Sequence, residues 1–290
     1  MLNSQLMECG IATSDDLLLN LPSCDEASNN AFLAKQIASK LIEIVNDDRA
    51  VENPLFLEFK PGFIDRLALN IVKNPHKSIA IGVSGESASG KTTLARKILD
   101  ICVNEKNKSL YTIIPSDNYY KDKSQELKDA GSYEALFERG FSLDEPAAVD
   151  LELLRKDLLR IKSGKKISTP EYDFITIASI PHKIEKKPAK VILLEGLFVL
   201  ENMLKEHLDV SIYVHTPADV IKDRWYKRSV SRGKTGRAAD MLFEIVNKGA
   251  KLYVRPYAKD ADIVISGVVS EYYIESVANK IKNAIREVLA

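Results

Sequence analysis

The chain has 290 residues, of which 45% are hydrophobic and 28% charged, with 41 basic and 41 acidic side chains. Its length suits one large domain, or one domain with a smaller companion, and its zero net charge argues against binding nucleic acid or anionic membranes through bulk charge. Three cysteines without a CxxC pair, no apolar run long enough to span a membrane and no pattern of a secretory signal favour a cytoplasmic protein with reduced thiols.

The N-terminal part of the chain has the pattern of a helical extension. Residues 1–30 are polar, and we expect them to be loosely ordered or to form short helical pieces. A long helix is predicted next, because one apolar face runs through Leu33, Ile37, Leu41, Ile44 and Val45. A second helix is predicted over 62–72. We therefore predict an N-terminal helical extension over residues 1–75, which packs on the main domain of residues 76–290 or forms a dimer contact.

From residue 78 the chain alternates between strand and helix patterns. Short apolar runs predict strands at 79–83, 110–115, 191–195, 210–215 and 263–265. Helical spacing predicts helices at 92–103, 150–162, 217–231, 238–249 and 271–288. Near-continuous apolar strands that alternate with helices indicate an α/β fold, in which helices cover both faces of a parallel sheet. The glycine and proline breaks of residues 164–187 predict a small β-hairpin that projects from the sheet edge.

The most informative motif joins the first of these strands to the helix at 92–103. It has the pattern G-x-x-x-x-G-K-T of a phosphate-binding loop, and its residues are Gly85, Glu86, Ser87, Ala88, Ser89, Gly90, Lys91, Thr92 and Thr93. Glycines let backbone N–H groups turn toward an anion, and the following helix adds the positive end of its dipole. Lys91 would reach the β- and γ-phosphates, and Thr92 would ligate Mg²⁺. The motif therefore predicts a P-loop NTPase fold that binds ATP with Mg²⁺.

Two carboxylates stand at predicted strand ends, where parallel sheets carry their sites. Asp117 follows the strand at 110–115 and can take a proton from an acceptor hydroxyl or reach Mg²⁺; the alternative is a turn-forming or helix-capping aspartate. Glu195 ends a strand of four apolar residues, and burying its charge is costly unless a cation such as Mg²⁺ is near. For Glu195 the alternative is a structural salt bridge.

The helix predicted at 217–231 carries Arg224, Arg228 and, just beyond it, Arg232 at a spacing of four residues. Arginines that close over a transferring phosphoryl group stabilise its charge, and Gly233 and Gly236 have the character of lid hinges. The alternative is an ordinary solvated basic face.

These pieces follow one another in an order that resembles the uridine kinase / phosphoribulokinase superfamily, with the uridine–cytidine kinase pattern as the best match over residues 78–268. The motifs are the P-loop, Asp117-x-x-Tyr120, Asp144-x-Pro146, Pro170-x-Tyr172-Asp173-Phe174, Glu195-Gly196, the arginine-rich lid and Ala261-Asp262-Ile-Val-Ile.

For the acceptor, the resemblance implies that Asp117 activates its hydroxyl and that Asp144 grips its sugar hydroxyls. Tyr120 and Tyr172 are implied as further acceptor contacts. The resemblance therefore describes an acceptor site with two acids and two aromatic side chains.

For the phosphates, the resemblance implies that Lys91 and Thr92 hold the polyphosphate and Mg²⁺ and that Glu195 is linked to the metal. Arg224 and Arg228 align with the lid arginines. The catalytic set is thus Asp117 with Lys91, Arg224 and Arg228.

Two positions depart from the family pattern. Uridine kinases place a histidine five positions after the tyrosine of the P-x-Y-D-F motif, where this chain has Ile177. They also place a glutamine shortly after the Gly-Arg of the lid, where this chain has Asp240 and Met241. Both family side chains hydrogen-bond the pyrimidine, which Ile and Met cannot do. The acceptor is therefore left open between uridine or cytidine and another sugar or alcohol.

The sequence predicts an ATP- and Mg²⁺-dependent small-molecule kinase that transfers the γ-phosphate to a hydroxyl. Two alternatives remain: a P-loop hydrolase or switch protein, for which the chain lacks an N-K-x-D motif, and a non-catalytic nucleotide-binding regulatory protein. The expected partners are a nucleoside triphosphate and a small alcohol, without nucleic acid or membrane. GTP as donor and a homo-oligomeric state are left open.

Overall fold

The computed structural model describes residues 26–60, 62–74, 77–102 and 111–289, so most of the segment expected to be loosely ordered lies outside the described residues. Among these, a six-stranded sheet has the order β1-β8-β7-β2-β6-β3. Its strands are β1 (Phe56–Phe59), β2 (Ile79–Gly85), β3 (Tyr111–Pro115), β6 (Val191–Glu195), β7 (Val210–His215) and β8 (Ile263–Ser266). All neighbours pair in parallel except β1, which pairs antiparallel with β8. The predicted parallel α/β sheet is confirmed, with one antiparallel strand added.

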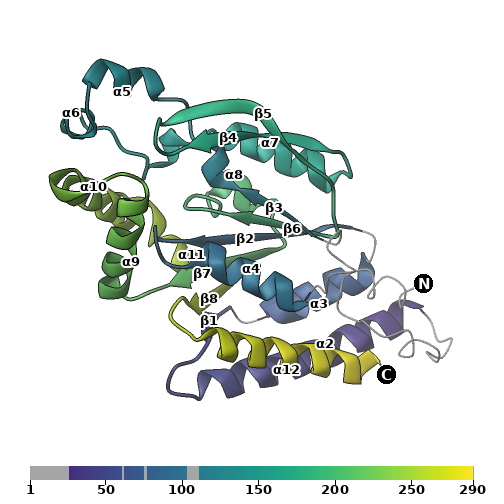
Figure 1. The fold of residues 1–290 in the computed structure, drawn as a ribbon. Helices are drawn as coiled ribbons and strands as arrows, with labels where there is room; N and C mark the ends of the chain where they lie inside the picture. The colour runs from purple at the N-terminus through teal and green to yellow at the C-terminus, as the bar shows by residue number, and fades with distance from the viewer. Residues whose placement is uncertain (1–25, 61, 75–76, 103–110, 290) are drawn as a thin grey trace.

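Helices cover both faces of this sheet (Figure 1). The longer ones are α2 (Glu26–Arg49), α3 (Phe63–Lys73), α4 (Lys91–Cys102), α7 (Leu151–Lys162), α9 (Ala218–Ser231), α10 (Gly236–Gly249) and α12 (Glu271–Leu289). The shorter ones are α5 (Ser124–Ala130), α6 (Tyr133–Glu138), α8 (Asn202–Lys205) and α11 (Tyr257–Asp260). Two 3₁₀ turns and a π-helical turn join them: η2 (Ser116–Tyr119), η3 (Pro146–Ala148) and η4 (Ala250–Val254).

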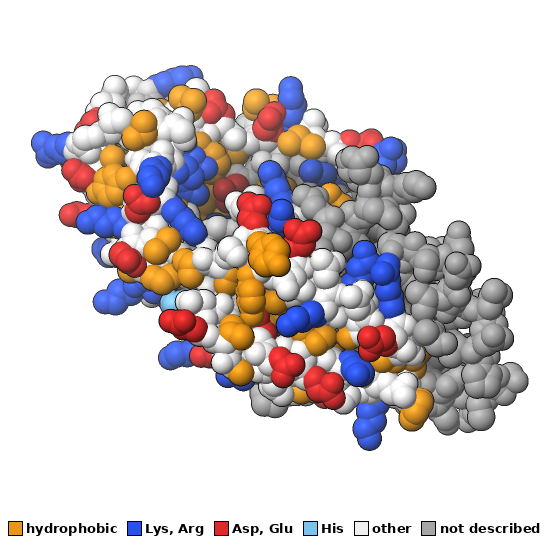
Figure 2. Space-filling view, turned by 60° about the horizontal axis from the view of Figure 1, so that its bottom comes forward, with side chains coloured by type: hydrophobic (Ala, Val, Ile, Leu, Met, Phe, Trp, Pro, Cys, Tyr) orange, Lys and Arg blue, Asp and Glu red, His pale blue; other side chains and the backbone are white. Residues whose placement is uncertain are grey.

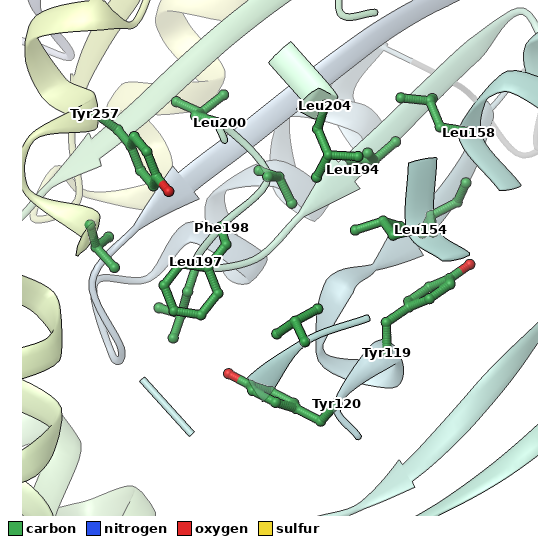
Figure 3. Close-up of a cluster of buried hydrophobic side chains, with 14 of the residues drawn as sticks. Tyr119, Tyr120, Leu154, Leu158, Leu194, Leu197, Phe198, Leu200, Leu204 and Tyr257 are labelled. Atoms are coloured by element: carbon green, nitrogen blue, oxygen red, sulfur yellow. The ribbon is translucent and has the colours of Figure 1, made fainter. Parts of the chain in front are cut away.

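Side-chain alternation along the strands divides the core into two layers. Val83, Leu193 and Val214 point to one face, where they pack with buried residues of α4 and α12. Their neighbours Leu194 and Tyr213 point to the other face and join the core beneath α7, α8 and α11. Figure 3 shows part of this second core, with Leu154, Leu158, Leu194, Phe198 and Leu204 among the side chains that it labels. Because the central strands are buried on both faces, their sequences are continuously apolar, as the strand prediction assumed.

The N-terminal segment is not purely helical, which corrects the prediction for residues 1–75. It contains β1, and this strand extends the main sheet by pairing with β8. Helix α2 packs along α12 and α3, so that the two ends of the described chain lie side by side in Figure 1. Buried Ala38 and Phe63 share one cluster with Val210 of β7. The segment and the rest of the chain therefore share one sheet and one core, and a domain boundary at residue 75 stays a prediction.

The predicted β-hairpin is present as β4 (Ile167–Asp173) and β5 (Ala178–Lys186), which pair antiparallel with each other. Helices α5 and α6 lie near one end of the hairpin, beside the end of the sheet where α9 and α10 also lie (Figure 1). The short helices α5 and α6 were not predicted. Together these elements surround one end of the sheet and form the walls of the site described below.

The surface agrees with the balanced composition. On the face drawn in Figure 2, basic and acidic side chains are interspersed. Among the described residues, no helix combines the length and the apolar character that crossing a lipid bilayer requires.

Candidate active site

The register of three strands brings the predicted site residues to one edge of the sheet. Val83 of β2 and Pro115 of β3 both lie beside Glu195 of β6. The three strands run in parallel, so the segments that follow them emerge at the same edge. These segments are the glycine loop after β2, the turn with Asp117 after β3, and Glu195 itself.

The loop after β2 has the geometry of an anion cradle. Gly90 has a φ of 90°, and a Cβ built on it would lie 3.3 Å from the Arg224 Nη1, so a side chain at this position would be strained and close to the arginine. Helix α4 begins at the next residue, Lys91, and points its N-terminal N–H groups into the loop. Lys91 is buried, which lowers the pKa of its amine, and nearby Asp117 and Glu195 oppose that effect.

Thr92 and Glu195 meet at the base of the loop. The Thr92 hydroxyl donates a hydrogen bond of 2.7 Å to the Glu195 Oε2. Burial raises the pKa of the Glu195 carboxyl, and the ammonium of Lys91 opposes this. A buried carboxylate and a hydroxyl side by side are hard oxygen donors of the kind that Mg²⁺ prefers.

Two arginines of α9 close over the loop. Arg228 donates a hydrogen bond to the Ser87 hydroxyl. Arg224 donates a bond of 2.9 Å to the Gly267 carbonyl, and its Nη1 lies 3.4 Å from the Ser89 carbonyl oxygen. Both arginines line a pocket together with Gly90, Lys91 and Thr92, so the structure brings the predicted phosphate-binding residues together.

A second cavity lies next to this pocket and shares Lys91 and Arg228 with it. Asp117, Tyr120 and Asp144 line this cavity too, so three of the four predicted acceptor contacts meet there. Tyr172 does not line the cavity. Its ring packs behind the wall, 5.2 Å from the ring of Tyr120, and its hydroxyl has no hydrogen-bond partner among the described residues.

Tyr120 reaches the cavity because it faces away from its neighbour. Figure 3 shows the rings of Tyr119 and Tyr120 pointing in different directions. The Tyr119 hydroxyl donates a hydrogen bond of 2.8 Å to Asp157 of α7, which anchors the turn that carries Asp117. The core thus fixes the segment that presents Asp117 and Tyr120 to the cavity.

Asp144 is the most perturbed acid of this cavity. Its side chain is only 6% exposed, and burial raises the pKa of its carboxyl to about 6, although Arg228 acts in the opposite direction. Helix α10 packs directly on this residue: a Cβ added at Gly249 would overlap the Asp144 carbonyl oxygen. The close approach of that glycine therefore holds the segment with Asp144 in place.

Most of the remaining lining is apolar. Ile177, at the position of the family histidine, lines the cavity, whereas Met241 does not. The other apolar side chains of the lining are Tyr133, Phe137, Phe141, Leu143, Phe174, Leu197, Trp225, Leu242 and Val246. Among the described residues, the lining contains no histidine, asparagine or glutamine.

Sequence reasoning missed two parts of this site. Lys234 lines the cavity from the lid turn, although nothing in the local sequence distinguishes it from a solvated lysine. Arg255 pairs with Glu86 of the loop, a contact between residues far apart in the chain. Only the folded chain brings these residues to the site.

The strand, glycine loop, helix and covering arginines define a P-loop kinase with an ATP-binding site. A family model described as the phosphoribulokinase / uridine kinase family matches residues 80–273. The uridine kinase of Proteus mirabilis is 32% identical over 195 residues, which cover 66% of this chain and 87% of that protein. The uridine kinase of Macrococcus caseolyticus is 33% identical over 216 residues, covering 72% and 98%. The chain belongs to the phosphoribulokinase / uridine kinase family.

Among solved structures, the phosphoribulokinase from Rhodobacter spheroides aligns with a TM-score of 0.46 and 17% identity, over 66% of this chain and 70% of that one.

Proposed function

We propose that this protein uses Mg²⁺–ATP to phosphorylate a hydroxyl of a small alcohol or sugar. The observation that carries the proposal is the shared cavity: Asp117 lines the same space as Lys91 and Arg228, which reach into the phosphate loop. A carboxylate at that place can accept the proton of an alcohol whose oxygen faces the γ-phosphate.

The reaction is a direct transfer. The acceptor oxygen attacks the γ-phosphorus, and the bond between that phosphorus and the oxygen bridging to the β-phosphate breaks. ADP leaves with the bonding electron pair, and the hydroxyl proton passes to the Asp117 carboxylate. Lys91, Arg224 and Arg228 stabilise the charge on the transferring oxygens, which is the main catalytic task in phosphoryl transfer.

The residues of the loop fit a magnesium ion. Thr92 and Glu195 offer adjacent hard oxygen atoms at the base of the loop, and Asp117 adds a second carboxylate nearby, as its effect on the pKa of Glu195 indicates. Such an ion would neutralise phosphate charge.

The lining supports a sugar or alcohol acceptor over uridine or cytidine. A pyrimidine needs partners for its polar edge, and a site that leaves such groups unpaired loses affinity. At the position of the family histidine the cavity presents Ile177, whose side chain cannot hydrogen-bond. Asp144 remains available to accept bonds from further hydroxyl groups of the acceptor.

The test is a coupled ADP-release screen over nucleosides, sugars, polyols and hydroxy acids, with mass spectrometry of the phosphorylated product. We expect ADP release that depends on an acceptor. Asp117→Asn should bind ATP nearly as well as the parent protein and transfer the phosphoryl group at least about a hundredfold more slowly. Fast ADP release that no acceptor changes would instead identify a hydrolase.

A further inference from the structure

Two cations of the lid turn reach the acceptor cavity, apart from those at the phosphate loop. Lys234 is only 7% exposed and lines the cavity with Arg232. The Lys234 amine donates a hydrogen bond of 3.1 Å to the Phe174 carbonyl and lies 4.2 Å from the centre of the Tyr133 ring. The Arg232 guanidinium lies 4.0 Å from the centre of the Phe174 ring. Both charges therefore rest on aromatic rings of the hairpin and α6.

Neither cation has a carboxylate partner among the described residues. Asp173, the acid whose charge acts on Lys234, accepts hydrogen bonds from the Ile175 backbone N–H and the Thr176 hydroxyl instead. Burial lowers the pKa of Lys234, and the charge of Arg232 lowers it further, while Asp173 opposes both. A buried ammonium beside a partly buried guanidinium, with neither in an ion pair, is unfavourable, and ring faces compensate for only part of that cost. An anion between the two side chains would remove the imbalance.

The two cations adjoin the acids of the cavity. The charges of Asp117, Glu195, Arg228 and Asp144 act on Lys91, and those of Arg232 and Asp173 act on Lys234. Arg232 also acts on Asp144, Tyr120 and Arg228. The cavity thus has a cationic end, formed by Lys234 and Arg232, that continues into the part where a hydroxyl can be activated.

Free hydrogen-bond donors remain at the cationic end. Lys234 has three N–H donors, and one of them is used by the Phe174 carbonyl. Arg232 has five donors, arranged in a plane that fits carboxylate and phosphate oxygens. A cation stacked on a ring keeps the edge of its N–H groups available, so the rings hold the donors in place for a ligand.

We propose that the acceptor is an anionic alcohol, whose carboxylate or phosphate group is bound by Arg232 and Lys234 while its hydroxyl faces Asp117. The inference rests on the proposed kinase function and names the substrate class. Hydroxy acids, sugar acids and sugar phosphates share this chemistry; neutral nucleosides do not.

The competing explanation is that Lys234 only fastens the lid to the hairpin through the Phe174 carbonyl. Lys234→Gln distinguishes anion binding from this structural role, because the glutamine amide can still donate to the Phe174 carbonyl but carries no charge. Lys234→Arg restores the charge. Lys227→Gln is the matched control, because Lys227 lies exposed on α9 and pairs with Asp223.

The experiment uses the full-length protein and compares three series of candidate acceptors with the same number of carbon atoms: neutral polyols, hydroxy acids and polyol phosphates. Rates of ADP release and masses of the products are measured together. We expect the anionic members to exceed the neutral ones by at least about tenfold in kcat/KM, the size expected for charge-assisted hydrogen bonds. Preference for the acid series or for the phosphate series then identifies the anion.

For the variants we expect Lys234→Gln to raise the KM of the anionic acceptor at least about tenfold, with kcat and the KM of ATP nearly unchanged. Lys234→Arg should recover part of this loss, and Lys227→Gln should show none. Arg232→Met provides a second variant, and ATP binding reports whether each variant is folded.

Three outcomes would overturn the inference. Neutral acceptors that react as well as their anionic counterparts would remove the anion requirement while leaving the kinase function intact. Equal effects of Lys234→Gln on both series would assign Lys234 a structural role. No phosphorylated product from any acceptor would reject the proposed function itself, and with it this inference.

Discussion

Arg255 binds Glu86 with both ends of its guanidinium group: Nε lies 3.0 Å from Oε1, and Nη2 lies 3.0 Å from Oε2. Glu86 is the first residue of the phosphate loop after Gly85, and Arg255 follows the π-helical turn η4. Arg255 also donates a bond of 2.8 Å to Asn247 of α10. The arginine therefore connects the phosphate loop to a helix of the acceptor cavity.

Arg255→Lys should weaken this connection although it keeps the charge, because an ammonium cannot make the two-point contact. For Arg255→Lys we expect roughly a tenfold loss in kcat/KM for ATP. For Arg255→Met we expect a fall of about 1–3 kcal/mol in the free energy of unfolding. Steady-state kinetics and urea unfolding measure the two effects. In combination with Glu86→Gln, the losses should be less than additive; strict additivity would show that the pair is not coupled.

Asp144 should make acceptor binding depend on pH. Its pKa of about 6 lies above the usual range for an aspartate, so the carboxylate that accepts acceptor hydroxyl bonds forms only as the pH rises through about 6. We expect kcat/KM for the acceptor to rise with pH up to about 6 and then to level off. The same profile for Asp144→Asn should be low and lack this step. A step that persists in Asp144→Asn would belong to another group.

The same residue should reduce the stability of the protein at neutral pH. At a pH below the ordinary pKa of an aspartate, the Asp144 carboxyl is protonated in both the folded and the unfolded chain, so it does not change the free energy of unfolding. Between that pKa and about 6 the carboxyl is protonated only in the folded chain, and the free energy of unfolding falls as the pH rises. The penalty reaches about 3 kcal/mol above pH 6. Asp144→Asn should therefore unfold at higher denaturant concentration than the parent at pH 7.5, with no such gain near pH 4.

Glu195→Gln should raise the requirement for Mg²⁺. The amide can still accept the bond from the Thr92 hydroxyl, which is 2.7 Å long in the parent protein, but it carries no charge for a metal. We expect the Mg²⁺ concentration for half-maximal rate to rise about tenfold or more. Titration of activity with Mg²⁺ measures this, with Glu185→Gln on the exposed surface of the hairpin as the control. An unchanged titration curve would show that Glu195 does not contribute to Mg²⁺ binding.

Gly249→Ala should be destabilising, against the usual preference of helices for alanine. In an open helix the change stabilises by about 1 kcal/mol, but here the new methyl group would overlap the Asp144 carbonyl oxygen. We expect a lower melting temperature and a higher KM for the acceptor, because the segment with Asp144 must move. Lys248→Ala, at the exposed neighbouring position, should change neither.

The strands and the phosphate-binding side of the site could be predicted because their signals are local. Strands β2, β6, β7 and β8 of the main sheet are mostly buried on both faces, so each appears as an apolar run, and the loop motif follows β2 directly. Asp117 and Glu195 could be found from their places at strand ends. Strand β1 was missed because it is four residues long, lies at the edge and is only partly buried, so its sequence carries no clear alternation.

The acceptor side depends on contacts that no local pattern contains. Lys234 reaches the cavity only because the turn after α9 folds against Phe174 and Tyr133. Ile177 could be named as a departure from the family pattern, but its place in an aromatic lining required the fold. The roles of Tyr172 and of the other predicted site residues stay predictions until the mutants are measured.

Strand β1 has a consequence for any attempt to shorten the chain. It is the outer neighbour of β8, and α2 covers α12. A protein that began at residue 76 would present a bare row of backbone N–H and C=O groups along β8 and an uncovered apolar stripe on α12, which invites association with other copies. Aggregation alone could abolish the activity of such a fragment. The role of the N-terminal residues is therefore better tested by single substitutions on the outer surface of α2.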